Sequence, residues 1–134
     1  MRLIPEFRAG IRYLLHRAED LKIRDRLVVI AQSEMGRTPT YNNGNGKDHW
    51  SIGSVMFLGR GIKGNRVIGA TDEKQFHVPL DPQKLACDPK NGVRVRPEHI
   101  HEALREFAGI ADHAYSKKFP LGVADKDRLR GLWG

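Results

Sequence analysis

Two polar segments that lie close together in the sequence carry the side chains best suited to chemistry. Residues 33–39 read Ser-Glu-Met-Gly-Arg-Thr-Pro, and residues 46–50 read Gly-Lys-Asp-His-Trp. Carboxylate and imidazole groups together suit a divalent cation such as zinc or manganese. We therefore take Glu34, Asp48 and His49 as candidate metal ligands. Spacing alone leaves an alternative open, because such residues in loops are more often surface hydrogen-bonding groups.

Three further side chains of these segments are candidates for substrate contacts. Arg37 presents a planar guanidinium that can hold an oxyanion through two parallel hydrogen bonds, a geometry that lysine does not offer. Lys47 could hold peripheral oxygens of the same group, and a substrate could pack against the ring of Trp50. An aromatic residue in such a position is also typical of core packing, so both interpretations of Trp50 stay open.

The elements expected around these segments place them beside a sheet. Apolar residues recur every three or four positions over residues 4–22, which predicts an amphipathic helix with one face packed on a sheet. Residues 27–31 (Leu-Val-Val-Ile-Ala) are apolar without alternation, which predicts a strand buried on both faces. Such strands belong to mainly parallel sheets with helices on either side. The expected fold class is therefore α/β.

Residues 32–50 form a long stretch without periodicity after this strand. In open α/β sheets, ligands bind at the carboxyl ends of the strands, where loops and helix amino termini converge. Loops longer than about 12–15 residues without structure of their own are usually functional or disordered. Because this loop holds charged and aromatic side chains, we favour a functional role.

Two further strands are expected, over residues 54–58 and 66–70. The glycine-rich residues 59–64 between them predict a hairpin turn. Their spacing fits neither the dinucleotide-binding fingerprint nor the phosphate-binding loop of nucleotide hydrolases. We therefore assign no phosphate cradle to these glycines.

The rest of the chain divides into a polar excursion, a helix and a tail. Residues 71–96 are punctuated by proline and aspartate and are expected to contribute little core. Pro97 suits the first position of a helix over residues 97–108. His99 and His101 point in different directions on that helix, so they are expected on its solvated surface. Residues 110–134 are expected to be an irregular tail packed onto the body.

Composition excludes several classes of protein. The net charge is +7, but basic and acidic residues are interleaved and aromatic residues make up only 7%. With no helix-turn-helix or zinc-finger spacing, we predict no nucleic-acid partner. No apolar run approaches the roughly 18 residues of a membrane span. A single cysteine, Cys87, cannot form an internal disulfide.

The predicted elements are too few for a complete parallel sheet, which usually has about five or six strands. The chain is therefore expected to be a single incomplete domain over residues 1–134, with a helix-strand-loop core in residues 1–70. Two ways of completing it remain: a homo-oligomer that shares the sheet, or a missing amino-terminal half. We favour the second, because the first helix begins almost at the start of the chain.

Several motifs resemble one known family. They are residues 28–39 (Val-Val-Ile-Ala-Gln-Ser-Glu-Met-Gly-Arg-Thr-Pro), residues 43–50 (Asn-Gly-Asn-Gly-Lys-Asp-His-Trp), and residues 61–64 with 67–72. Over about residues 5–115, the chain resembles the carboxyl-terminal half of DUF1501, a family of bacterial proteins related to the alkaline phosphatase and sulfatase superfamily.

The resemblance implies a fold, a cofactor and a location. It implies part of an alkaline phosphatase-like α/β/α sandwich, in a protein roughly three times longer. It also implies a divalent metal site of zinc, manganese or calcium at the strand ends. Family members are often exported, to the periplasm or the cell surface, by a signal that this chain lacks.

The resemblance also assigns roles to individual residues. Glu34 matches a metal-binding aspartate, Met35 stands where a histidine would follow it, and His49 resembles a later metal-binding histidine. The nucleophile of the superfamily has no counterpart in this chain. We expect part of a hydrolase for phosphoric or sulfuric esters of small molecules or glycans, without activity in isolation. The alternative is a non-catalytic binding or cell-surface module.

Overall fold

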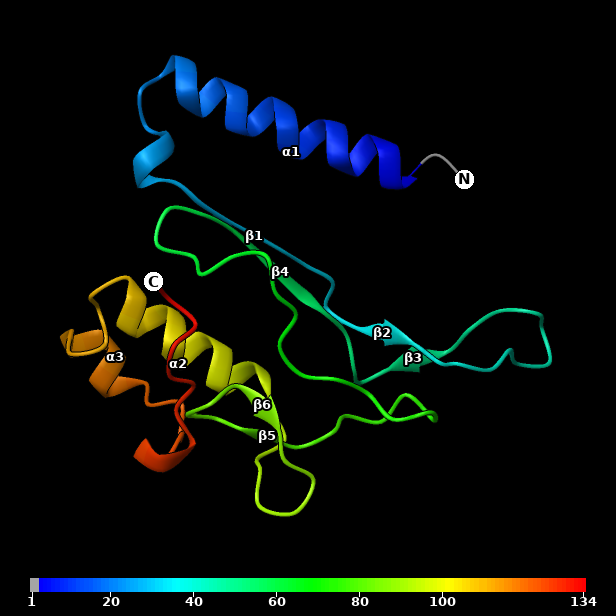
Figure 1. Ribbon diagram of the computed structural model, residues 1–134. Helices are drawn as coiled ribbons and strands as arrows, with labels where there is room; N and C mark the ends of the chain where they lie inside the picture. Colours follow the sequence, from blue (N-terminus) through cyan, green and yellow to red (C-terminus); the bar gives the residue numbers. More distant parts are fainter. Residues whose placement is uncertain (1–2) are drawn as a thin grey trace.

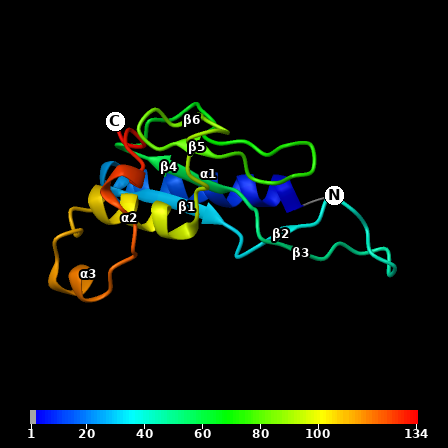
Figure 2. The same ribbon diagram turned by 90° about the horizontal axis from the view of Figure 1, so that it is seen from below.

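Helices lie on both sides of a two-stranded ribbon in the computed structural model, which describes residues 3–134 (Figure 1 and Figure 2). Within these residues the strands form three separate antiparallel pairs. The expected partial α/β/α sandwich with a mostly parallel sheet is therefore wrong. The elements in chain order are α1 (Leu3–Asp20), η1 (Arg24–Arg26), β1 (Val28–Gln32), β2 (Gly36–Arg37), β3 (His49–Trp50), β4 (Val55–Gly59), β5 (Leu80–Asp81), β6 (Ala86–Cys87), α2 (Pro97–Phe107), α3 (Ala114–Lys118) and η2 (Asp125–Asp127).

The ribbon of β1 and β4 shows why the fold class was mispredicted. Val28 lies opposite Gly59, and Gln32 lies opposite Val55, so the two strands run antiparallel. The residues of β1 are half-buried or exposed, and Ile30 is 43% exposed. The prediction of a strand buried on both faces is therefore wrong. A short apolar run locates a strand, but its periodicity does not reveal what covers that strand.

Of the two strands predicted next, the structure contains one. β4 confirms the strand predicted over residues 54–58, shifted by one residue. Residues 66–70 form no strand, so the predicted hairpin is wrong. Gly59 adopts a φ of 140°, and a Cβ atom there would collide with the carbonyl oxygen of Leu27. Glycine is therefore required where the chain leaves the ribbon.

α1 confirms the helix predicted over residues 4–22 but not its packing. Figure 1 shows the helix set apart from the ribbon. Ala18 is the one buried residue of α1, and Phe7 and Leu14 on its apolar stripe remain about half exposed. The residues that the structure describes therefore leave most of this stripe uncovered. No helix over residues 3–134 is long and apolar enough to cross a membrane.

The hydrophobic core lies in the part of the chain that follows β4. Leu80 is completely buried, although it belongs to residues 71–96, so the prediction of little core in that segment is wrong. Leu80 and Val93 exchange two backbone hydrogen bonds of 2.8 Å, which fix the segment around the buried side chain. The other buried members of the core are Ala103 and Leu129, surrounded by Ile68, Leu85, Val95, Ile100, Leu132 and Trp133.

α2 confirms the helix predicted over residues 97–108, with Pro97 in its first turn and Ala103 buried. The prediction that His99 is solvated is wrong, because this residue is only 6% exposed. Its Nδ1 atom accepts a hydrogen bond of 3.1 Å from the backbone N–H of Arg96. The imidazole thus contributes to the cap at the start of the helix, where backbone donors lack helical partners.

The carboxyl-terminal segment packs onto the body with Trp133 as its main anchor, but the prediction of an irregular tail is wrong, because the segment contains α3 and η2. The indole Nε1 donates a hydrogen bond of 3.1 Å to the carbonyl oxygen of Ala103. The ring centroid lies 4.6 Å from that of Phe107 and 5.8 Å from that of Phe57. One side chain therefore joins α2 to β4.

Charged side chains hold the same segment at a second point. The Arg128 guanidinium lies 3.3 Å from a carboxylate oxygen of Glu102 and 2.8 Å from one of Glu106, both on α2. All three side chains are partly shielded from solvent. Arg66 donates a hydrogen bond of 3.0 Å to the carbonyl oxygen of Leu132. These contacts fix the position of the tail that carries Trp133.

Replacing Trp133 tests this arrangement. Trp133→Ala removes the aromatic contacts and the indole hydrogen bond, and it should lower the free energy of unfolding by about 3 kcal/mol. Tyr13→Ala, on the exposed surface of α1, should change it by less than about 0.5 kcal/mol. Urea denaturation followed by circular dichroism measures both. Equal stability of the two variants would contradict the anchoring role of Trp133.

Candidate functional site

The predicted site residues lie on and beside the β2–β3 hairpin, which extends the chain beyond the β1–β4 ribbon (Figure 1). Gly36 pairs with Trp50, and Arg37 pairs with His49. Cross-strand neighbours in an antiparallel pair place their side chains within reach of each other. The hairpin therefore brings the guanidinium of Arg37 and the imidazole of His49 to the same place.

The pKa of the Glu34 carboxyl group, just before β2, is lowered from its ordinary value. Its own backbone N–H lowers the pKa of the carboxyl group most, and the Ser33 hydroxyl, 3.2 Å from a carboxylate oxygen, lowers it further. The charges of Arg37 and His49 act in the same direction. The Glu34 side chain is exposed and stays ionised below its ordinary titration range. The guanidinium of Arg37 and the imidazole of His49 therefore act on the Glu34 carboxyl through their charge.

Asp48, the third candidate metal ligand, has a structural role in the hairpin loop. Its Oδ1 atom accepts a hydrogen bond of 2.7 Å from Nδ2 of Asn42. Its backbone N–H donates to the hydroxyl of Thr38, and its carbonyl accepts from the Thr38 N–H. The side-chain oxygen of Asn42 accepts from the N–H groups of Gly44 and Gly46. These bonds explain why the Asn-Gly-rich loop folds as it does.

The candidate ligands do not form a complete metal centre by themselves. Over residues 3–134 no group of three or more histidine, cysteine, aspartate or glutamate side chains is arranged to hold a metal ion. The charge of His49 lowers the pKa of Glu34, but no ion pair joins the two side chains in the described residues, and the carboxylate of Asp48 is bonded to Asn42. Zinc in proteins usually takes at least three protein ligands. The described residues therefore provide at most part of a metal site.

The candidate substrate-binding residues differ in how far their side chains are engaged in contacts within the loop. One nitrogen of Arg37 donates a hydrogen bond of 3.2 Å to the carbonyl of Lys47, and the side chain remains exposed. The Lys47 ammonium donates to the carbonyl of Pro39 at 3.4 Å and lies 5.2 Å from the ring centroid of Tyr41. Arg37 is thus positioned by the loop beside His49, while Lys47 is used within the loop.

Trp50 connects the hairpin to a distant segment. Its Nε1 atom donates a hydrogen bond of 3.0 Å to the carbonyl of Gln75, and its ring lies 5.2 Å from that of Phe76. The side chain is half-buried. These contacts favour the packing interpretation of Trp50 that the sequence left open.

Sequence reasoning missed two residues that shape the site. Asn42 organises the loop, and its position before two nearby glycines is a turn signal that could have revealed it. Gln75 contributes only its backbone carbonyl to Trp50. Because any residue has that group, no sequence signal could have identified it.

Comparison with known proteins gives one family and no individual relative. The model of the family described as "Protein of unknown function (DUF1501)" matches residues 2–87. The match includes the whole β2–β3 hairpin but ends before α2 and before residue 115, where the resemblance was expected to end. No curated protein and no solved structure matches the chain.

The electrostatics of Glu34 can be tested by removing one neighbouring charge. Arg37→Gln should raise the pKa of Glu34 toward its ordinary value of 4.5, because a favourable interaction with the carboxylate is lost. Lys47→Gln should leave that pKa unchanged. Carbon-13 titration of the carboxyl group measures both variants.

The sign of the pH dependence follows from the same shift. The pKa of Glu34 is lower in the folded chain than its ordinary value. The ionised carboxylate therefore contributes to stability at pH values above that ordinary pKa, and the contribution is lost as the pH falls through the lowered pKa. An unchanged pKa in Arg37→Gln would mean that the two side chains do not interact.

Gly36 tests whether the hairpin register positions the site. A Cβ atom at residue 36 would collide with the carbonyl oxygen of Ile52. Gly36→Ala should therefore disturb the pairing of Arg37 with His49 and cost about 1–3 kcal/mol of stability. At Gly44 a new Cβ would lie 3.5 Å from Oδ1 of Asn42, an ordinary contact, so Gly44→Ala is the matched control. Loss of cross-strand nuclear Overhauser effects in Gly36→Ala alone is the expected result, and their retention would refute the requirement for glycine.

Proposed function

We propose, because the chain belongs to the DUF1501 family of proteins of unknown function, that it supplies part of a metal-dependent site for the hydrolysis of phosphoric or sulfuric esters. The observation that carries this proposal is the pairing of Arg37 with His49 in the β2–β3 hairpin, with both charges acting on the nearby carboxyl group of Glu34. The resemblance of the surrounding motifs to the alkaline phosphatase and sulfatase superfamily supports it. The substrates would be esters of small molecules or glycans.

Each of the three side chains has a task that suits its chemistry. The carboxylate of Glu34 and the imidazole of His49 would hold a divalent cation of zinc, manganese or calcium as two of its ligands. The exposed guanidinium of Arg37 would bind the oxyanion of the ester. The remaining ligands would come from another polypeptide segment. We therefore assign no catalytic step to this chain in isolation.

A non-catalytic binding or cell-surface module is the second candidate. Met35 favours it, because the resemblance places a metal-binding histidine at that position. A thioether is a poor ligand for hard or borderline cations. The hydrogen bond from Asn42 to the carboxylate of Asp48 also favours the binding module, because it engages a predicted metal ligand within the loop. A module of this kind would bind an anionic ester at Arg37 and His49 without cleaving it.

Calorimetric titration with zinc and with manganese tests the metal half-site. The chain should bind the cation weakly, and Glu34→Ala or His49→Ala should each weaken binding by at least about tenfold. Glu73→Ala and His16→Ala remove the same two types of group at exposed positions elsewhere and should have no effect. Equal losses in all four variants would show that the binding is nonspecific.

Turnover separates the two candidate functions. Aryl phosphate and aryl sulfate are offered, with zinc, manganese or calcium, to a longer member of the family that contains this hairpin. Metal-dependent hydrolysis that is lost when the residue matching Glu34 is changed to alanine supports the hydrolase. Cation binding without turnover on either ester supports the binding module and refutes the hydrolase.

A further inference from the structure

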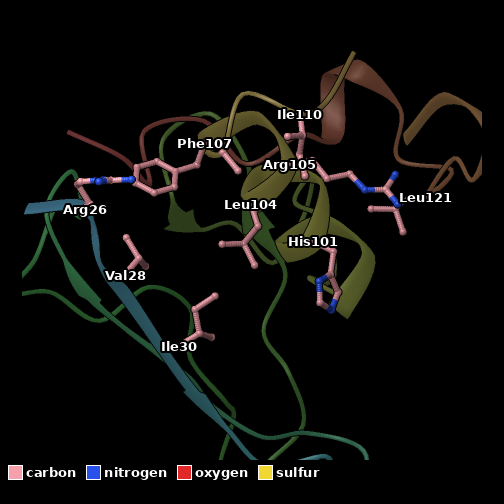
Figure 3. Close-up of a pocket in the computed structure, with 10 residues that line it drawn as sticks. Arg26, Val28, Ile30, His101, Leu104, Arg105, Phe107, Ile110 and Leu121 are labelled. Atoms are coloured by element: carbon pink, nitrogen blue, oxygen red, sulfur yellow. The ribbon is translucent and has the colours of Figure 1, made fainter. Parts of the chain in front are cut away.

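An apolar groove of about 730 Å³ separates β1 from α2 (Figure 3). Val28 and Ile30 of β1 point into it from one side, and Leu104 of α2 faces them from the other. Phe107, Ala108, Ile110 and Leu121 complete its apolar lining. Ile30 is 43% exposed and Ile110 is 48% exposed. No segment within residues 3–134 covers these apolar side chains completely.

One edge of the ribbon lies open beside the groove. β1 pairs only with β4 among the described strands, and Figure 2 shows β4 on one side of β1 with no strand on the other. An unpaired edge presents backbone N–H and C=O groups that can accept a further strand. The helix α2 lies across the groove from β1. A strand added beside β1 would therefore cover exposed residues of α2 as well.

The charge around the groove is of one sign. Its polar lining residues are Arg26, His101 and Arg105, and none is acidic. The guanidinium of Arg105 also donates to the carbonyls of Ser116 and Phe119, so Arg26 is the arginine of the lining whose side chain makes no hydrogen bond within the described residues. The neighbouring Arg24 and Arg60 pair with Glu19 and Asp25, whereas Arg26 has no ion-pair partner in the part of the chain that the structure describes. Opposite charges across an interface steer association and fix register. The polar lining of the groove therefore favours an acidic partner.

We propose that the groove and the free edge of β1 form a docking site for a partner polypeptide, which adds an apolar and acidic strand to the ribbon. Its alternate apolar side chains would fill the groove above Leu104 and Phe107, and its backbone would pair with β1. An acidic side chain would reach Arg26. This docking does not require the metal half-site, which lies on the β2–β3 hairpin.

A second copy of this chain is the less suitable occupant. Each copy carries a net charge of +7, and two copies meeting at this groove would bring Arg26 and Arg105 of both together. Like charges at an interface disfavour association. The strand of the partner must therefore carry the acidic groups that the groove lacks.

Synthetic strands test the proposal with the full 134-residue chain. The probe is a capped octapeptide that alternates glutamate and valine. It is compared with a lysine–valine octapeptide and with a glutamate–valine peptide methylated at every backbone nitrogen, which cannot donate a backbone hydrogen bond to β1 from either edge. Nitrogen-15 spectra should change at residues 28–32 and along α2 with the first peptide. The lysine peptide should bind several-fold more weakly, and the methylated peptide should not bind.

Variants locate the binding. Arg26→Ala should weaken binding of the glutamate peptide about threefold to fivefold, whereas Arg8→Ala, which removes the same charge from α1, should not. Ile110→Ser should weaken it as well, with exposed Val67→Ser as the control. The proposal is overturned by absence of binding at about 1 mM peptide, by equal binding of all peptides, or by spectral changes outside the groove. Sedimentation of the chain as a dimer through β1 would overturn it in favour of self-association.

Discussion

The indole of Trp133 joins parts of the chain that would otherwise share little core. It bonds to the backbone of α2 and contacts the rings of Phe107 on α2 and Phe57 on β4. The buried cluster around Leu80, Ala103 and Leu129 adjoins it. Because burial of apolar surface is the main source of folding free energy, the stable part of the molecule is this region. α1 and the β2–β3 hairpin extend from it with few buried side chains.

The sequence predicted the elements better than their surroundings. The helices of residues 4–22 and 97–108 were predictable because long apolar periodicity and Pro97 leave few alternatives. The apolar residues 27–31 located a strand but could not show that its partner would be antiparallel β4 or that Ile30 would stay exposed. Leu80 lies in a segment interrupted by prolines, where no apolar periodicity marks a core residue. Its burial depends on residues far away in the sequence, Ala103 of α2 and Leu129 of the tail.

The candidate site was predictable in composition but not in geometry. Residue types made Glu34, Arg37 and His49 candidates, which stay a prediction, and the hairpin pairing that sets Arg37 opposite His49 depends on Gly36 and on loop bonds from Asn42. The carboxylate of Asp48 accepts one of these bonds from Asn42. Its residue type suggested a metal ligand and could not show that it stabilises the loop. A site on a hairpin outside the core is suited to being completed by another polypeptide, as is the open edge of β1. Both features reflect the small core that Trp133 holds together.

Amide hydrogen exchange of the intact chain measures this division directly. If the core around Trp133 is the stable unit, amides of α2 and β4 should exchange most slowly, and those of α1 should exchange much faster, because its apolar stripe lacks a packing partner in the described structure. Protection of α1 equal to that of α2 would contradict the account. It would mean that the amino-terminal helix belongs to the same cooperative core.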